Sequence, residues 1–315
     1  MPLFEAEKNQ VLNNLLTDRF LVPPFSILDT KQGYWQSRRS SWLKLGIKSE
    51  EGRDAGCLPS GFDEAKYGKK ISESTSIFDP VLCEIAYRWF SREGDKVIDP
   101  FAGGSVRGIV ASILKRNYTG IDLSAMQIDA NKKQLVEINN KYESNLNVNW
   151  INGDSLTCKE IAKDDYNLLF TCPPYYDLEV YSDKENDLSN MGTYAEFMQI
   201  YTQIIKNACE MLVDDSFAVI VVGNMRNHTN GAYYDFAGDT IRAFEQAGLI
   251  YYNEMVLVNT AGTLPLRAPK IFNASRKVGR QHQNVLVFYK GNPRNISGKF
   301  GDVAGLTQIR IEGEN

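Results

Sequence analysis

The sequence predicts an α/β fold, in which a mostly parallel sheet is covered by helices on both faces. Two observations predict it. From about residue 95 onward, short apolar strands alternate with segments of helical periodicity, and the loops after four of these strands carry glycine, proline or aspartate. A chain of 315 residues, 43% of them apolar, can bury the core of one large domain, with or without an added lobe.

The expected strands and helices follow one another along the chain. Apolar runs predict strands at 96–99, 118–122, 148–152, 166–171, 217–222, 251–258 and 284–289. Helical periodicity predicts helices at 106–115, from the N-cap Ser124 onward, near 194–212 and near 236–247. Strands joined through helices pair in parallel. We therefore expect one main domain at 73–292, preceded by an N-terminal extension (1–72) rich in glycine, serine and charge and followed by a C-terminal tail (293–315).

Several classes of protein are excluded by simple features of the chain. The N-terminus, MPLFEAEKNQ, carries acids where a signal peptide needs a basic start, and no apolar run approaches the length of a membrane span. The five cysteines form no CxxC pair, and the two histidines have no metal-binding spacing. We expect a cytoplasmic protein without membrane contact, disulfide framework or metal, and the sequence leaves its oligomeric state open.

The charge is unevenly distributed, although the net charge is only −4. Residues 255–301 contain no aspartate or glutamate, and neither do residues 31–48, where Arg38 and Arg39 alternate with Trp35 and Trp42. Basic side chains with aromatic residues between them suit a surface that follows a nucleic-acid backbone and stacks bases. The sequence therefore predicts contact with nucleic acid, and the extension is a candidate DNA-contacting or lid segment.

In a parallel sheet, ligands bind at the carboxyl ends of the strands, and three loops there suit a nucleotide-like cofactor. The first is glycine-rich and lets the backbone approach a ligand closely. Asp122 comes 23 positions after Asp99, which is the spacing of an acid that binds ribose hydroxyls. Asp154 could accept a hydrogen bond from an adenine amine. The predicted cofactor-binding residues of these loops are Asp99, Phe101, Ala102, Gly103, Gly104, Asp122, Leu123, Asp154 and Ser155.

The loop after the fourth strand carries a family resemblance. It reads TCPPY at 171–175, and the first loop reads DPFAG at 99–103. Together they resemble the catalytic and cofactor motifs of the S-adenosylmethionine-dependent DNA methyltransferases that modify the exocyclic amine of cytosine (N4) or adenine (N6). Residues 76–82 are similar to the segment that lies against the methionine end of the cofactor in this family, which adds Phe78, Asp79 and Pro80 to the cofactor site.

The resemblance spans residues 76–289 and implies a Rossmann-like methyltransferase sheet with an antiparallel last strand. It also implies S-adenosylmethionine as cofactor, double-stranded DNA as partner, and a target base flipped out of the helix. The catalytic residues it implies are Cys172, Pro173, Pro174 and Tyr175. An exocyclic amine is a poor nucleophile because its lone pair is conjugated, so the site needs acceptors for its hydrogens. The carbonyl of Pro173 is expected to be one of them, and Tyr175 is expected to stack the base.

The chain departs from the family at two places. Cys172 stands where the family has Asp, Asn or Ser, and because cysteine is closest in size to serine, it favours cytosine N4 over adenine N6. Gly103-Gly104-Ser105 replaces the common Gly-Ser-Gly. Cys172 leaves open cytosine carbon-5 methylation by a thiolate or a catalytically silent DNA-binding protein. An RNA or a protein amide as substrate also remains open.

The cofactor motifs precede the catalytic motif, so the target-reading element must come from an insertion or a terminus. The best candidate is the acid-free stretch 259–283, whose predicted DNA contacts are Arg267, Lys270, Arg276, Lys277 and Arg280. Five acids follow the catalytic motif closely, at Asp177, Glu179, Asp183, Glu185 and Asp187. We interpret them as a solvated loop.

Overall fold

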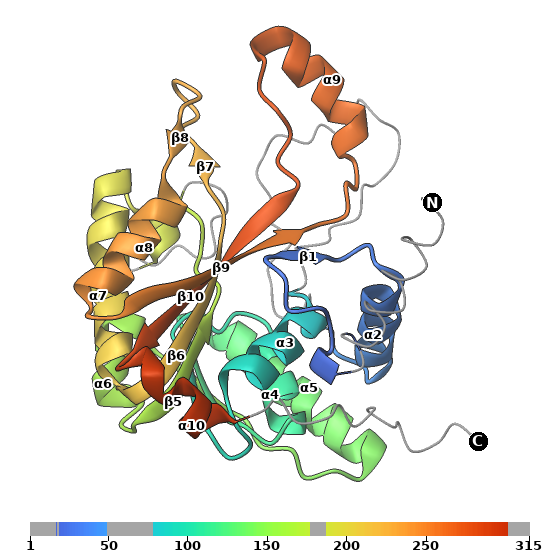
Figure 1. Cartoon of the computed structure of the whole chain (residues 1–315), viewed down its shortest axis with the longest axis vertical. Helices are drawn as coiled ribbons and strands as arrows, with labels where there is room; N and C mark the ends of the chain where they lie inside the picture. The colour runs from blue at the N-terminus through green and yellow to red at the C-terminus, as the bar shows by residue number, and fades with distance from the viewer. Residues whose placement is uncertain (1–16, 18, 49–77, 177–186, 302–315) are drawn as a thin grey trace.

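The computed structural model describes residues 17, 19–48, 78–176 and 187–301, and it contains one eight-stranded sheet (Figure 1). The strand order is β1-β9-β10-β6-β5-β2-β3-β4. Strands β6, β5, β2, β3 and β4 pair in parallel, and β10 is antiparallel to both β6 and β9. The predicted α/β sheet, mostly parallel with an antiparallel last strand, is confirmed.

The predicted strands all occur, with small shifts at their ends. They are β2 (Lys96–Asp99), β3 (Asn117–Asp122), β4 (Asn149–Asn152), β5 (Tyr166–Thr171), β6 (Leu212–Val222), β9 (Ile250–Val258) and β10 (His282–Lys290). The largest difference is in β6, which begins five residues before its expected start. The extra residues include Asp215, which has a left-handed φ of 58° and accepts a hydrogen bond from Tyr289 (3.1 Å). The sequence pattern missed this part of β6 because its polar residues interrupt the apolar run.

Helices cover both faces of the sheet, as predicted. One face carries α2 (Gly33–Lys44), α3 (Pro80–Phe90), α4 (Val106–Ile113) and α5 (Ala125–Tyr142); the other carries α6 (Cys158–Ile161), α7 (Tyr194–Glu210) and α8 (Phe236–Gln246). Each face of the sheet has its own hydrophobic core, and the central strand β6 contributes to both. Val219 and Val221 lie in the core on the α2–α5 face, and Ile220 and Val222 lie in the core on the α6–α8 face. Burying each such side chain contributes roughly 1.5–3 kcal/mol.

The described part of the N-terminal extension belongs to this domain. Strand β1 (Ile27–Asp29) pairs in parallel with β9 at the edge of the sheet, and α2 packs against α3. Trp35 and Trp42 of α2 are only 0% and 1% exposed, so the expectation that they stack bases is wrong. Tryptophan carries the largest apolar area of any residue, and burial in the core gains more than exposure beside charges. Residues 1–16, 18 and 49–72 of the extension lie outside the described residues.

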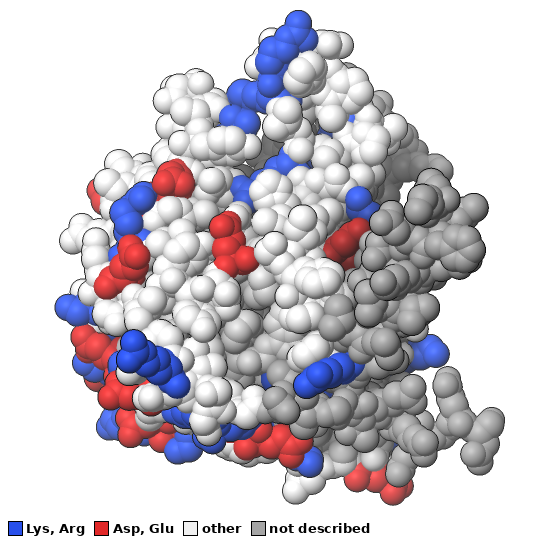
Figure 2. All heavy atoms as spheres, in the orientation of Figure 1, with Lys and Arg blue, Asp and Glu red and all other residues white. Residues whose placement is uncertain are grey.

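Two segments project from the domain. Residues 259–281, which we call the arm, connect β9 to β10 and contain α9 (Leu264–Ser275), which extends beyond the sheet in Figure 1. A hairpin of β7 (Met225–Arg226) and β8 (Tyr233–Tyr234) projects in the same direction. Figure 2 shows basic side chains on the upper lobe that contains the arm, whereas both signs of charge mix over the lower body. No residue of α9 is buried.

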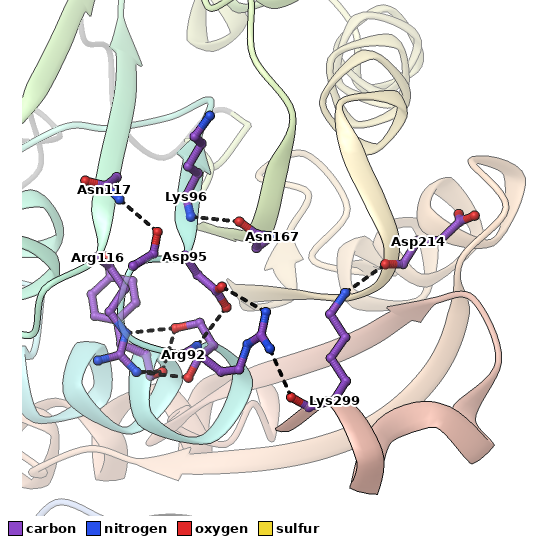
Figure 3. A network of polar contacts seen from close by, with 11 residues as sticks. Arg92, Asp95, Lys96, Arg116, Asn117, Asn167, Asp214 and Lys299 are labelled. Atoms are coloured by element: carbon purple, nitrogen blue, oxygen red, sulfur yellow. Dashed lines mark hydrogen bonds and ion pairs between the residues drawn. The ribbon is translucent and has the colours of Figure 1, made fainter. Parts of the chain in front are cut away.

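The amino-terminal edge of the sheet is closed by a polar network (Figure 3). The guanidinium of Arg92 donates to the carbonyl of Lys299 (3.3 Å), and the ammonium of Lys299 donates to the carbonyl of Asp214 (2.9 Å). Asn117 donates to the carbonyl of Gly94 (2.8 Å). The two bonds of Lys299 attach α10 (Ile296–Phe300), in the expected C-terminal tail, to the body of the domain. The polar network lies at the amino-terminal ends of the parallel strands, opposite their carboxyl-terminal ends.

A membrane-spanning helix and a metal site each have structural requirements that can be checked in the described residues. Across the described ranges, no helix has the length and apolarity needed to cross a bilayer. Within the same ranges, no cluster of three or more histidine, cysteine or acidic side chains is arranged to hold a metal ion.

Candidate active site

The predicted cofactor loops and the catalytic motif meet at the carboxyl-terminal edge of the sheet. Strand β2 lies between β5 and β3, so the loop at 99–105, which we call the glycine loop, is flanked by the ends of both neighbours. The residues at 171–175, which we call the proline turn, begin with the last residue of β5. The pairing order of the sheet therefore brings together segments that are far apart in the sequence.

Asp99 links the glycine loop to the proline turn. Its carboxylate is fully buried, and Oδ1 accepts hydrogen bonds from the backbone N–H of Phe101 (3.1 Å) and the hydroxyl of Thr171 (2.6 Å). Oδ2 accepts from Nε of Arg107 and from the hydroxyl of Tyr118, both at 2.6 Å. A carboxylate offers about four acceptor positions, and all are used here. We therefore assign Asp99 to holding the site together rather than to direct contact with a cofactor.

Arg107 was missed by the sequence analysis. Its buried guanidinium also donates to the carbonyls of Phe101 (2.6 Å) and Ala102 (2.9 Å), and it lies 4.6 Å from the ring centre of Phe78. Burial is the largest single effect and lowers the pKa of Arg107, but the charge and hydrogen bond of Asp99, together with Tyr118 and Cys172, outweigh burial and raise that pKa. The arginine stays ionised and braces the glycine loop. A single charge in the otherwise apolar helix at 106–113 was the available signal.

Asp122 and Gly103 form the part of the site that suits a ribose. The carboxylate of Asp122 accepts from the backbone N–H of Gly103 (2.9 Å) and of Ser124 (2.8 Å), and its side chain is partly exposed at the end of β3. Gly103 has a φ of 51°, in the left-handed region that favours glycine. Its carbonyl accepts from the buried amide of Asn131 (2.8 Å), a second residue that the sequence analysis missed.

The loop after β4 is joined to the glycine loop. The hydroxyl of Ser155 donates to the carbonyl of Pro100, and Ser155 is buried. Asp154 accepts from the backbone N–H of Leu156 (2.9 Å) and caps η2 (Ser155–Thr157), while remaining partly exposed. The carbonyl of Leu123 accepts from the side-chain amide of Asn152 (3.0 Å). These contacts bring the three predicted cofactor loops together.

The segment expected at the methionine end begins, within the described residues, at Phe78. The ring of Phe78 packs edge-on against Phe170 at 5.7 Å and faces Arg107. Asp79 caps α3 by accepting from the backbone N–H of Val81 (2.8 Å), and Pro80 is the first residue of that helix. Burial raises the pKa of Asp79. Ser76 and Ile77 lie outside the described residues.

The proline turn presents one aromatic ring beside its carbonyls. Pro173 is buried, and Cys172, Pro174 and Tyr175 are partly exposed. The hydroxyl of Tyr175 accepts from the side-chain amide of Gln283 (3.0 Å), and its ring meets Phe236 edge-on at 6.1 Å. The turn can thus offer carbonyl acceptors and an aromatic surface from a rigid backbone, because prolines fix φ and carry no N–H.

The predicted DNA contacts divide into two groups. Arg267, Lys270 and Arg276 are partly or fully exposed on the arm, and Lys277 lies against Gly231 of the hairpin. The other three are engaged by the protein itself. Arg38 binds the buried Glu84 (2.5 Å) and Arg39 lies 3.7 Å from Asp79, whereas Arg280 donates to the carbonyls of Asn224 (2.7 Å) and His282 (2.8 Å).

The five acids after the proline turn fall mostly outside the described residues, at 177–186. Asp187 is the exception. It is only 5% exposed and accepts from the backbone N–H of Ser189 (2.9 Å), so it caps η3 (Leu188–Asn190). The interpretation of a solvated acid is wrong at this position, because an unpaired helix N-terminus attracts a carboxylate.

No family model matches the sequence. Among solved structures, similar chains include a SAM-dependent methyltransferase from Agrobacterium tumefaciens (16% identity, TM-score 0.45, covering 71% of this chain and 66% of that one). A methyltransferase from Pyrococcus furiosus is similar at 14% identity and TM-score 0.44 (73% and 92% covered). TrmN from Thermus thermophilus is similar at 13% and 0.43 (68% and 49%), so the chain spans about half of TrmN. Likeness at this level of identity and TM-score does not assign this chain to a family.

Proposed function

We propose that this protein transfers a methyl group from S-adenosylmethionine to an exocyclic amine of a flipped base in double-stranded DNA, either cytosine N4 or adenine N6. The observation that carries the proposal is the hydrogen bond from the hydroxyl of Thr171 to Asp99 (2.6 Å). It joins the proline turn to the glycine loop, so a cofactor on the glycine loop would face an amine on the proline turn.

The residues at the carboxyl-terminal edge fit this cofactor. Asp122 is partly exposed beside Gly103, where its carboxylate can accept from ribose hydroxyls, and Asp154 is partly exposed at the end of β4, where it can accept from the adenine amine. When bound, S-adenosylmethionine supplies an electrophilic methyl group next to the proline turn.

The chain's own groups would then prepare the amine. The carbonyl of Pro173, and more weakly the thiol of Cys172, accept hydrogen bonds from the amine. These bonds favour a tetrahedral nitrogen. Tyr175 stacks the extruded base, and its own position is fixed through Gln283 and Phe236. Because the acceptors belong to a rigid turn, little reorganisation accompanies the transfer.

The arm supports DNA as the partner. Arg267, Lys270, Arg276 and Lys277 lie in a stretch without acids and on the side of the molecule to which the carboxyl-terminal loops open. Phosphate contacts from such residues would position the duplex, although the whole chain is weakly acidic.

Nucleoside mass spectrometry tests the proposal. Unmethylated duplex DNA is incubated with the protein and S-adenosylmethionine carrying a deuterated methyl group, with RNA and a protein extract treated in parallel. We expect the label in N4-methylcytosine or N6-methyladenine, and a loss of label with Tyr175→Ala. Label confined to 5-methylcytosine, RNA or protein, or cofactor binding without any transfer, would contradict it.

A further inference from the structure

Tyr175 is held by a residue from the base of the arm. The side-chain amide of Gln283 donates to the Tyr175 hydroxyl at 3.0 Å, across 108 positions of sequence. Gln283 lies at the start of β10, directly after the arm rejoins the sheet. The ring of Tyr175 is thereby restrained at two places, at its hydroxyl by Gln283 and along its edge by Phe236.

Arg280 fixes the backbone on either side of Gln283. Its guanidinium donates to the carbonyl of His282 (2.8 Å) and to Oδ1 of Asn284 (2.9 Å), which are the two neighbours of Gln283. A third bond reaches the carbonyl of Asn224 (2.7 Å), just after β6. A Cβ on Gly223 would lie 3.2 Å from guanidinium atoms, so the arginine lies directly against the main chain there. Burial lowers the pKa of Arg280, because desolvation disfavours the charged guanidinium.

We propose that Gln283 is a positioning residue that sets the tilt of the Tyr175 ring and couples the arm to the proline turn. A stacked base follows the plane of the ring, so a ring that swings about its side-chain bonds presents the amine to the Pro173 carbonyl only part of the time. Arg280 holds the backbone on both sides of Gln283. Because Arg280 lies in the arm, a displacement of the arm moves Gln283 and, through its hydrogen bond, Tyr175. The inference deepens the proposed function and rests on it for its catalytic consequence.

The contact itself is tested without activity. In protein labelled with 3-fluorotyrosine, the ¹⁹F resonance of Tyr175 is identified by its loss in Tyr175→Phe. We expect Gln283→Leu to shift or broaden that resonance. Gln203→Leu is the matched control, because Gln203 is exposed on α7 and its amide likewise makes a side-chain hydrogen bond, to Asn207 (2.8 Å). An unchanged Tyr175 resonance in Gln283→Leu would overturn the inference.

The consequence is tested by a kinetic cycle. We expect Gln283→Leu and Tyr175→Phe each to lower kcat by about 2- to 10-fold, the range for one neutral hydrogen bond, with an unchanged KM for S-adenosylmethionine. The double variant should be no worse than either single variant, because both remove the same interaction. If Gln283→Leu and Tyr175→Phe unfold at midpoints close to that of Gln203→Leu, their lower kcat is due to lost positioning and not to lost stability.

The outcomes distinguish the two proposals. If the native protein methylates DNA and Gln283→Leu keeps its full kcat, the inference fails and the proposed function stands. If the two losses multiply in the double variant, the residues act independently and the inference again fails. If the native protein transfers no methyl group to DNA, the proposed function fails, while the fluorine resonance still decides whether Gln283 positions Tyr175.

Discussion

The carboxylate of Asp99 illustrates how much one buried residue decides. Its pair with Arg107 is nearly inaccessible to water, with side-chain exposures of 0% and 6%, so removing either partner leaves a buried charge and costs about 3–5 kcal/mol. The pair of Arg242 and Asp239 is as short (2.5 Å) but more exposed, and such pairs contribute about 0–1 kcal/mol. Asp99 and Arg107 therefore hold the glycine loop in place, while Asp122 and Tyr175 are partly exposed at the same edge of the sheet.

Asp122 provides the first prediction at this scale. Asp122→Ala should weaken binding of S-adenosylmethionine by about 1–3 kcal/mol, because hydrogen bonds to a charged acceptor are lost. Isothermal titration calorimetry measures the change. Asp129→Ala, an exposed acid on α5, is the control and should bind normally. Equal affinities of Asp122→Ala and the native protein would remove Asp122 from the cofactor site.

Cys172 distinguishes amine methylation from carbon-5 methylation. Cys172→Ser should retain methyl transfer in an amine methyltransferase, because serine fits the same space and accepts hydrogen bonds better than a thiol. Carbon-5 methylation would instead use Cys172 as a nucleophilic thiolate. Under that mechanism the serine variant is inactive, since its hydroxyl is a far weaker nucleophile.

Transfer of a radiolabelled methyl group to duplex DNA measures the activity of the Cys172→Ser variant. A folded serine variant that binds the cofactor without turnover, together with a covalent protein–DNA adduct of the native enzyme, would overturn the amine mechanism.

At the scale of elements, one glutamate joins α2 to α3. Glu84 is fully buried in α3 and accepts from Arg38 (2.5 Å) and from the indole of Trp42 (2.8 Å), both in α2. Arg88, one turn along α3, completes the group at 2.8 Å. Burial acts to raise the pKa of Glu84, but the hydrogen bond and charge of Arg38, with that of Arg88, outweigh burial and lower it below its ordinary value of 4.5.

This lowered pKa predicts how acid affects the helix pair. Because the folded pKa lies below the unfolded one, the contribution of Glu84 to stability is fully present above pH 4.5 and is lost as the pH falls through the folded pKa. Glu84→Gln should be less stable than the native protein by about 3–5 kcal/mol at pH 7. The gap should stay constant down to about pH 4.5 and narrow below it.

Urea unfolding at a series of pH values measures this gap. Glu245→Gln, an exposed glutamate on α8, is the control and should follow the native protein at every pH. A gap for Glu84→Gln that persists unchanged to pH 3, or that is absent at pH 7, would contradict this account of the α2–α3 contact.

At the scale of the whole molecule, the distribution of charge matters more than its sum. The chain carries a net charge of −4, yet residues 255–301 have no acid, and the arm within this stretch projects beyond the sheet (Figures 1 and 2). A polyanion responds to the local field, which falls off within about 10 Å at 0.1 M salt. Acids on the lower body therefore do little to repel DNA from the arm.

The salt dependence of DNA binding tests the arm. The sequence predicts phosphate contacts from Arg276, Lys277 and Arg280. Because Arg280 donates hydrogen bonds to the protein itself, only Arg276 and Lys277 are neutralised in the test. Arg276→Gln with Lys277→Gln should weaken binding to all duplexes and reduce the slope of log K against log salt by about one per lost phosphate contact.

Lys132→Gln with Lys133→Gln, two exposed lysines on α5, serves as the matched control for charge. Fluorescence anisotropy over a range of salt concentrations gives both slopes. If the arm variant keeps the native slope while the α5 variant loses it, DNA follows another surface.

Most of the fold was predictable because its signals are local. Apolar runs and helical periodicity repeat within a few residues, and they located the seven strands from β2 to β10 that the sequence predicted. The start of β6 was missed where Asp214 and Asp215 interrupt the apolar run. The glycine loop, Asp122 and the proline turn could also be found, because each follows directly on its strand and turn chemistry is written in adjacent residues.

The sequence by itself thus determined the strand–helix rhythm, the loops that carry chemistry and the basic stretch that became the arm. Only the tertiary structure decided that Trp35 and Trp42 are core, that Arg38 and Arg280 serve the protein's own acceptors, and that Asp99, Thr171 and Arg107 join the two halves of the site. The contacts that settle these questions include Arg38 with Glu84, Asp99 with Thr171 and Tyr175 with Gln283, which link residues 46, 72 and 108 positions apart. Periodicity reports only on neighbours, so whether an arginine faces phosphate or a buried carboxylate is decided when distant segments pack.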